Sequence, residues 1–203
     1  MHSDHDSTSQ TAIIPPETLI SAYSQGIFPM SEHKEDNEVD WYSATRRGII
    51  PMDQFRVSSN VQRLIRQGNF EVRYNSAFRE VVKACSDRET SWISPVIIES
   101  YQRLHEMGYA HSVEIWKEKK LKGGLYGVAL RGAFFGESMF KNDKELDKIA
   151  LYFCHQRLKE RRFKLWDTQF YTEHLSQFGC IEISAEEYEE RLQQAMDFRA
   201  FFD

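Results

Sequence analysis

The sequence predicts an α+β fold in which a small N-terminal α/β subdomain, residues 13–54, precedes a larger domain, residues 55–203. Two patterns indicate this: helical and strand periodicities alternate along the chain, and three consecutive strands followed by a helix occupy its middle. With 203 residues, of which 41% are hydrophobic and 28% charged, the chain can bury cores for both parts. The longest unbroken apolar run, residues 149–154, is far shorter than the roughly 18 residues of a membrane-spanning helix.

The N-terminal part begins with residues 1–12, a polar stretch that predicts a disordered tail and lacks the basic start and apolar core of a secretory signal. Pro15 and Pro16 then precede a predicted helix over residues 17–25, which Gly26 ends. Short apolar runs interrupted by proline, residues 26–30 and 47–53, predict edge strands and turns on either side of an acidic loop. The three cysteines, Cys85, Cys154 and Cys180, show no CxxC spacing, so we expect reduced thiols in a cytoplasmic protein.

The next segment is basic although the whole protein carries a net charge of −5. Val61, Leu64 and Ile65 predict a helix after Ser58, residues 70–74 alternate as a strand, and residues 77–84 predict a second helix. Arg63 and Arg66 share a face of the first helix, and Arg79 and Lys83 share a face of the second, so the four cations could be presented together. Such a surface fits an anionic partner, although a solvated helical face is the alternative.

The second half predicts an antiparallel meander with strands at residues 112–117, 121–130 and 133–140. An amphipathic helix over 146–158, a strand over 163–170, a helix over 173–177, a strand over 180–183 and a terminal helix over 185–196 follow. Meander, helix, strand, helix, strand resembles the core of GNAT-like acyltransferase domains. An enzyme of that fold that uses acetyl-CoA should open the helix after the meander with a glycine-rich turn, and residues 141–147 contain no glycine and three acids.

Three polar residues stand at the ends of apolar strands. Glu137 lies in an aromatic string beside Gly136, and Asp167 and Gln169 are two residues apart, so both face one side of a strand. Each could be a satisfied strand-end group, but together they predict polar groups that converge on a cleft. The histidines show no metal-binding spacing and no serine lies in GxSxG, so neither a metal site nor a hydrolase triad is predicted.

Several strings occur together in the order and spacing of one protein family. They are LISAYSQGIFPM at residues 19–30, WYS at 41–43, RGIIP at 47–51, GGLYGV at 123–128, GESMF at 136–140 and DTQF at 167–170. The chain resembles the leucyl/phenylalanyl-tRNA-protein transferases from about residue 15 to residue 192. The resemblance implies a cytoplasmic bacterial enzyme that moves leucine or phenylalanine from aminoacyl-tRNA to the N-terminal arginine or lysine of a protein, which marks it for degradation.

The resemblance also implies roles for the polar residues, with no cofactor and a GNAT-like domain that lacks the coenzyme A loop. Asp167, Gln169 and Glu137 are the implied catalytic group. Gln169 would hydrogen-bond the attacking amine or the tetrahedral intermediate, and Asp167 would orient Gln169 and stabilise the developing positive charge. Glu137 would hold the cationic acceptor residue.

Further residues are assigned to donor and tRNA binding: the donor-pocket residues from the matched strings, the tryptophans from their loop-like contexts and the cations from their helical spacing. Leu125, Phe134 and Met139 would line the donor side-chain pocket, and Trp41 and Trp92 would contact the terminal adenosine of the tRNA. Arg63, Arg66, Arg79 and Lys83 would bind tRNA phosphates. Departures from the family pattern at Ala44, at Leu146 with Asp147, and at Trp166 leave the donor preference open. An acetyl-CoA-dependent N-acetyltransferase and a non-catalytic tRNA-binding module remain the alternatives, and we expect a monomer.

Overall fold

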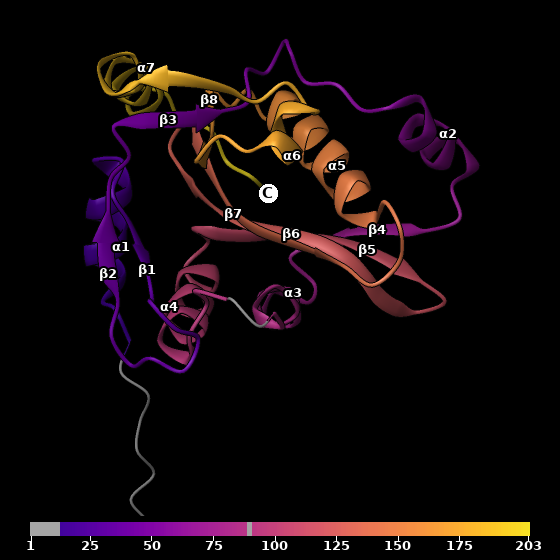
Figure 1. Cartoon of the computed structure of the whole chain (residues 1–203), viewed down its shortest axis with the longest axis horizontal. Coiled ribbons are helices and arrows are strands. Elements are labelled where there is room, and N and C mark those ends of the chain that lie inside the picture. The colour runs from indigo at the N-terminus through magenta and orange to yellow at the C-terminus, as the bar shows by residue number, and fades with distance from the viewer. Residues whose placement is uncertain (1–12, 89–90) are drawn as a thin grey trace, which may run out of the picture.

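A computed structural model describes residues 13–88 and 91–203, so the predicted disordered tail, residues 1–12, lies outside the described part (Figure 1). The helices are α1 (Pro16–Ser24), α2 (Ser59–Gln67), α3 (Phe78–Ser86), α4 (Pro95–Glu106), α5 (Leu146–Glu160), α6 (Glu173–Ser176) and α7 (Ala185–Asp197). The strands are β1 (Phe28–Met30), β2 (Asp40–Tyr42), β3 (Arg46–Ile49), β4 (Glu71–Tyr74), β5 (Ala110–Lys117), β6 (Lys120–Leu130), β7 (Ala133–Lys141), β8 (Leu165–Gln169) and β9 (Ile181–Ser184).

A seven-stranded sheet in the order β4-β5-β6-β7-β8-β3-β9 organises the fold, and β1 and β2 form a separate two-stranded sheet. The predicted meander is confirmed: β5, β6 and β7 pair antiparallel in sequence order. The predicted order of helix, strand, helix and strand after the meander is also confirmed, as α5, β8, α6 and β9, with α7 at the end. The molecule therefore has the α+β architecture expected of a GNAT-like domain.

Helices cover both faces of this sheet. Two adjacent glycines of β6 show this, because an added Cβ at Gly123 would lie 2.5 Å from Leu146 of α5, whereas one at Gly124 would lie 3.5 Å from Val81 of α3. Neighbouring strand residues point to opposite faces, so α5 and α3 lie on opposite sides, as Figure 1 shows. Helix α4 packs beside α3, and α2 packs against α5.

Strand β3 connects the N-terminal part to the large sheet. It lies between β8 and β9 and pairs antiparallel with both. The predicted subdomain of residues 13–54 therefore supplies one strand of the central sheet, while α1, β1 and β2 pack at its side (Figure 1).

Helix α4 has no counterpart among the predicted elements. Pro95 occupies its first turn, and Val96, Ile97, Tyr101 and Leu104 form its buried face. Proline is favourable at that position because its missing N–H would have no partner there. Within the described residues no helix is long and apolar enough to cross a membrane.

Candidate active site

The candidate site lies where β7 and β8 separate. These two strands pair in parallel only from Ala133 and Leu165 to Phe135 and Asp167. Beyond that point, β7 carries an irregularity opposite Tyr126 and Gly127 of β6, and Glu137 is the extra, unpaired residue. A bulge of this kind redirects a side chain away from the regular pleat, so Glu137 is turned toward the opening between the strands.

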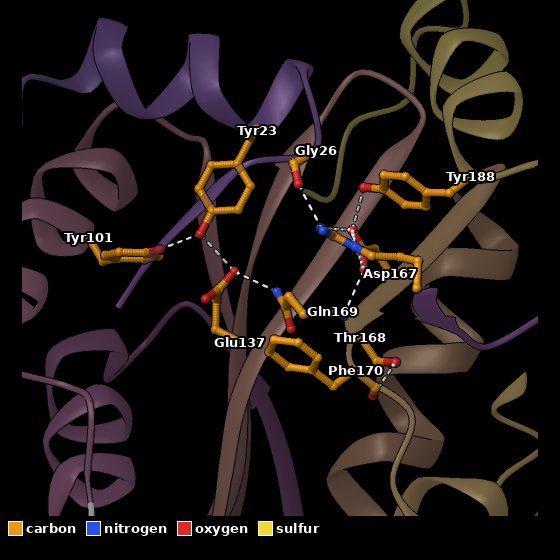
Figure 2. Close-up of polar contacts among 10 residues, drawn as sticks. Tyr23, Gly26, Tyr101, Glu137, Asp167, Thr168, Gln169, Phe170 and Tyr188 are labelled. Atoms are coloured by element: carbon orange, nitrogen blue, oxygen red, sulfur yellow. Dashed lines mark hydrogen bonds and ion pairs between the residues drawn. The ribbon is translucent and has the colours of Figure 1, made fainter. Parts of the chain in front are cut away.

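The end of β8 contributes the second polar group. Gln169 has a φ of 57°, and the N–H of Phe170 donates to the carbonyl of Thr168 at 2.6 Å, which forms a γ-turn around Gln169. A non-glycine residue in the left-handed region is strained, and such strain concentrates at functional sites. The turn directs the Gln169 amide toward Glu137, and Nε2 of Gln169 donates to Oε1 of Glu137 at 3.1 Å (Figure 2).

Asp167 is the anchor behind this turn and is fully buried. One of its oxygens, Oδ1, accepts the backbone N–H of Gln169 at 2.7 Å. Arg47 donates through Nε at 3.0 Å to Oδ1 and through Nη2 at 2.6 Å to Oδ2, and the Tyr188 hydroxyl donates to Oδ2 at 2.6 Å. Asp167 thus fixes the backbone of Gln169, and it does not line the cavity described below.

Arg47 is as deeply buried as its partner, with 1% of the side chain exposed. Its Nη1 donates to the carbonyl of Gly26 at 2.8 Å, and its guanidinium lies over the rings of Phe28 and Tyr188. The ion pair with Asp167 raises the pKa of Arg47 despite its burial. Each charge of the pair is therefore compensated, as buried charges must be.

Glycine at position 48 brings β3 close enough to β8 for this pair to form. An added Cβ at Gly48 would lie 2.4 Å from the backbone carbon of Phe170, which no side chain could tolerate. The same position is where the β3–β8 register shifts. Glycine is therefore required by close approach of the two backbones.

Glu137 is surrounded by neutral donors. The Tyr23 hydroxyl donates to its Oε1 at 2.7 Å, and Tyr101 donates to the Tyr23 oxygen, because Tyr23 has only one proton to give (Figure 2). Burial is the main reason that the pKa of Glu137 rises to about 8, and the nearby charge of Asp167 adds to the increase. Burial likewise raises the pKa of Tyr23 and Tyr101, so both stay protonated. A cation brought next to Glu137 would stabilise its ionised form.

An apolar cavity of about 90 Å³ opens beside these groups. Glu137, Thr168 and Gln169 form its polar edge. The predicted donor-pocket residues Leu125, Phe134 and Met139 all line it. Trp166, whose departure from the family pattern was expected to affect the donor preference, lines it too, as do Leu151 and Leu175, which were not predicted to do so. One water needs only about 10–15 Å³ of such space, so the cavity can admit a small apolar group.

The two tryptophans predicted to contact adenosine lie elsewhere. Trp41 is 42% exposed on β2, opposite Pro29 of β1. Trp92 is partly buried and packs against the hydrophobic core, and its carbonyl accepts the N–H of Ser31. Neither lines the cavity.

The four predicted phosphate-binding cations do not form one surface, which corrects the expectation that they are presented together. Arg63 and Arg66 lie on α2, on the α5 side of the sheet, whereas Arg79 and Lys83 lie on α3, on the opposite side (Figure 1). Arg79 is also engaged, because both of its terminal nitrogens bond Glu99. Spacing along each helix predicted only which residues share a face, not how the two helices are placed.

Four residues of the site were missed as functional: Tyr23, Arg47, Tyr101 and Tyr188. Two of them fall in the family-like strings, Tyr23 in residues 19–30 and Arg47 in residues 47–51. A charged residue directly before an apolar run, as Arg47 is before residues 48–50, indicates a buried partner elsewhere in the chain. Tyr101 and Tyr188 lie on helical faces whose other buried members are mostly apolar, so their sequence contexts indicate only core positions.

Comparisons with known proteins match almost the whole chain. A family model described as leucyl/phenylalanyl-tRNA protein transferase matches residues 49–193, and a model for the N-terminal domain of that family matches residues 13–44. The leucyl/phenylalanyl-tRNA–protein transferase of Herpetosiphon aurantiacus is 47% identical over 193 residues, which is 95% of this chain and 100% of that protein. The proteins of the same name from Ruegeria pomeroyi and Gloeobacter violaceus are 44% and 46% identical and cover 93% and 90% of this chain, and 90% and 94% of their own lengths.

Proposed function

Because this chain belongs to the leucyl/phenylalanyl-tRNA–protein transferase family, it is an aminoacyltransferase that uses aminoacyl-tRNA, and we propose that its acceptors are proteins with N-terminal arginine or lysine. Leucine or phenylalanine attached to such an N-terminus would mark the protein for degradation. We further propose a cytoplasmic monomer, since charged tRNA and newly made protein N-termini occur together in the cytoplasm.

The reaction converts an ester into an amide. The α-amine of the acceptor attacks the ester carbonyl of the aminoacyl-tRNA, so a C–N bond forms, the C–O bond to the terminal ribose breaks, and a proton passes from the amine to the leaving oxygen. An α-amine has an ordinary pKa of about 8, so a fraction is already unprotonated at neutral pH. Alignment of amine and carbonyl is therefore the main task of the enzyme.

The geometry supports a division of labour among three residues. The side chain of the donor amino acid would enter the apolar cavity, whose polar edge places Gln169 and Glu137 beside the ester. Gln169 would hydrogen-bond the attacking amine or the tetrahedral intermediate, and Asp167 would fix the turn that carries it. Glu137 would hold the cationic acceptor residue.

One observation carries this proposal: Glu137 and Gln169 are hydrogen-bonded to each other at the edge of an apolar cavity, and the donors to Glu137 are neutral. A partly buried carboxylate that is bonded only to neutral donors is suited to bind a cation. The positive acceptor terminus supplies that charge.

For tRNA, we propose that exposed cations on both sides of the molecule contribute separately. Arg63 and Arg66 of α2 lie on one side and Lys83 of α3 on the other, while Arg79 is occupied by Glu99. Trp41, exposed on β2, remains the candidate for stacking on the terminal adenosine, with Trp92 nearer the core.

An acetyl-CoA-dependent reaction is disfavoured by the start of α5. Glu145 caps this helix and Asp147 lies in its first turn, and no glycine precedes it in residues 141–145. Acidic side chains at this end repel the pyrophosphate that a GNAT-like enzyme would bind there.

The test is transfer of radiolabelled leucine, and separately phenylalanine, from charged tRNA to a peptide with N-terminal arginine. The matched control peptide begins with citrulline, which has nearly the shape of arginine without its charge. We expect transfer to arginine and at least about tenfold less transfer to citrulline. Equal transfer to both peptides would refute the role of Glu137, and no transfer from either donor would refute the proposed reaction.

A further inference from the structure

The hydroxyl of Tyr126 is a buried polar group without a hydrogen-bond partner in the part of the chain that the structure describes. Its side chain is fully buried, and its ring packs edge-on against Tyr101 at 5.8 Å and Phe78 at 5.9 Å. A buried hydroxyl that could donate and does not is costly. The location of this orphan group is therefore informative.

Tyr126 lies directly opposite the bulge that carries Glu137. In the β6–β7 register, Tyr126 pairs with Ser138 and Gly127 pairs with Gly136, so Glu137 is the residue between these partners. Tyr126 also lines the same cavity as Glu137 and Gln169. The orphan hydroxyl thus belongs to a residue that adjoins the acceptor-binding carboxylate and was not assigned any role from the sequence.

The carboxylate has room for another donor. Tyr23 and Gln169 both donate to the same oxygen, Oε1, whereas an ionised carboxylate offers about four lone-pair sites on two oxygens. Burial and the charge of Glu137 hold the pKa of Tyr126 well above its ordinary value, so this phenol keeps its proton and remains a donor.

We propose that Tyr126 is a positioning residue for the acceptor: its hydroxyl donates to Glu137 when the carboxylate is ionised to hold the cationic N-terminal residue. The inference rests on the proposed function, because it assigns Glu137 the acceptor. Without acceptor in the site, the Tyr126 hydroxyl has no hydrogen-bond partner among the described residues. Arrival of the acceptor cation charges Glu137, and Tyr126 then stabilises the charged form.

Other ionisable groups also face this pair, and a test must keep them unchanged. Tyr23, Arg47, Tyr101 and Asp167 influence Glu137. Cys85, Arg88 and Tyr101 lie near Tyr126. A single Tyr126→Phe substitution leaves all of them in place and removes only the oxygen.

The first test compares Tyr126→Phe with the wild type and with Tyr109→Phe, a matched change at a partly buried tyrosine that does not line the cavity. We expect Tyr126→Phe to unfold at the same temperature as the wild type or higher, because the lost hydroxyl makes no bond. Its kcat/KM for the arginine peptide should fall about tenfold, with the acid limb of the pH profile shifted to higher pH, and KM for charged tRNA unchanged. A wild-type pH profile, or a clearly lower unfolding temperature in Tyr126→Phe alone, would overturn the proposal.

The second test does not depend on transfer. The carboxyl ¹³C resonance of Glu137 reports its titration, and we expect a higher pKa in Tyr126→Phe than in the wild type because a donor to the charged form has been removed. Equal values would overturn the role of Tyr126 even if transfer occurs. Conversely, the pKa of Glu137 could be higher in Tyr126→Phe while the wild type transfers no amino acid. That result would support the hydrogen bond from Tyr126 to Glu137 and refute the proposed function. In Glu137→Gln, adding Tyr126→Phe should cause no further loss of transfer.

Discussion

Removing the charge of Asp167 is the most direct test of how the site is built. In Asp167→Asn, the oxygen that accepts the Gln169 N–H can persist, but an amide NH₂ replaces the oxygen that now accepts from Arg47 and Tyr188. The amide NH₂, which is a hydrogen-bond donor, would then face the donors of Arg47 and Tyr188. Arg47 would be left buried without a counter-ion, and its partners would be the retained amide oxygen, the Gly26 carbonyl and two aromatic rings.

The expected cost follows from the burial of both partners. Removing one member of a fully buried ion pair destabilises a protein by about 3–5 kcal/mol, out of a total of about 5–15 kcal/mol. For a chain of this length, each kcal/mol corresponds to about 2–4 °C. We therefore expect Asp167→Asn to lower the unfolding temperature by about 10 °C and to abolish transfer at temperatures where it is still folded.

Two variants make the measurement by urea and thermal unfolding interpretable. Glu182→Gln breaks the exposed ion pair with Arg46, so the free energy of unfolding should fall by less than about 1 kcal/mol. Arg47→Met combined with Asp167→Leu removes both buried charges and should recover much of the stability without restoring transfer, because Gln169 would lose its anchor. A loss below about 1 kcal/mol in Asp167→Asn would refute the reasoning, since it would mean that Arg47 does not depend on this carboxylate.

Four further outcomes are expected. Because the pKa of Glu137 is raised to about 8, the native state holds a proton that the unfolded chain releases above pH 4.5; stability should fall by up to about 5 kcal/mol between pH 5 and 8 in urea unfolding, and Glu137→Gln should remove that slope. Gln169→Gly should lose transfer yet stay at least as stable as Gln169→Ala, since a φ of 57° suits glycine; the reverse order in unfolding experiments would contradict the strained turn. Arg66→Ala should reduce the salt dependence of tRNA binding by about one phosphate contact, whereas Arg79→Ala should change it less; equal effects in a filter-binding titration would mean that the bond to Glu99 breaks on binding. Trp166→Ala should enlarge the cavity, cost about 3–5 kcal/mol and favour phenylalanine over leucine as donor; an unchanged ratio of the two transfer rates would exclude Trp166 from the donor pocket.

Local patterns were sufficient for much of the fold. Period-two alternation with charged or glycine turns predicted β5, β6 and β7, and the apolar stripe of residues 146–158 predicted α5. The polar residues at strand ends, Glu137, Asp167 and Gln169, were also predicted to converge, and the structure brings them together. These features depend on neighbours in sequence or on strand ends that meet at one place.

Long-range placement could not be predicted from such patterns. Nothing in residues 46–49 indicates that β3 lies between β8 and β9, and only that placement brings Arg47 to Asp167. The cations of α2 and α3 could not be placed relative to each other for the same reason, because helical spacing does not indicate which side of the sheet a helix covers. The bulge at Glu137 also depends on the partner strand, so its effect on the side chain was invisible in the sequence.

The two acids of the site lie in opposite electrostatic environments, and this difference supports the separate roles that we propose for them. Asp167 has its own cation, Arg47, and two further hydrogen-bond partners, the Gln169 N–H and the Tyr188 hydroxyl, so it can fix the backbone of Gln169 and has no need of a substrate charge. Glu137 is bonded only to neutral groups, Tyr23 and Gln169, and its raised pKa measures the cost of charging it without a counter-ion. A cationic substrate removes that cost, whereas a neutral one does not. In the function we propose, discrimination between acceptors follows because no cation among the described residues is hydrogen-bonded to Glu137, whereas a carboxylate paired directly with Arg47, as Asp167 is, could not provide it.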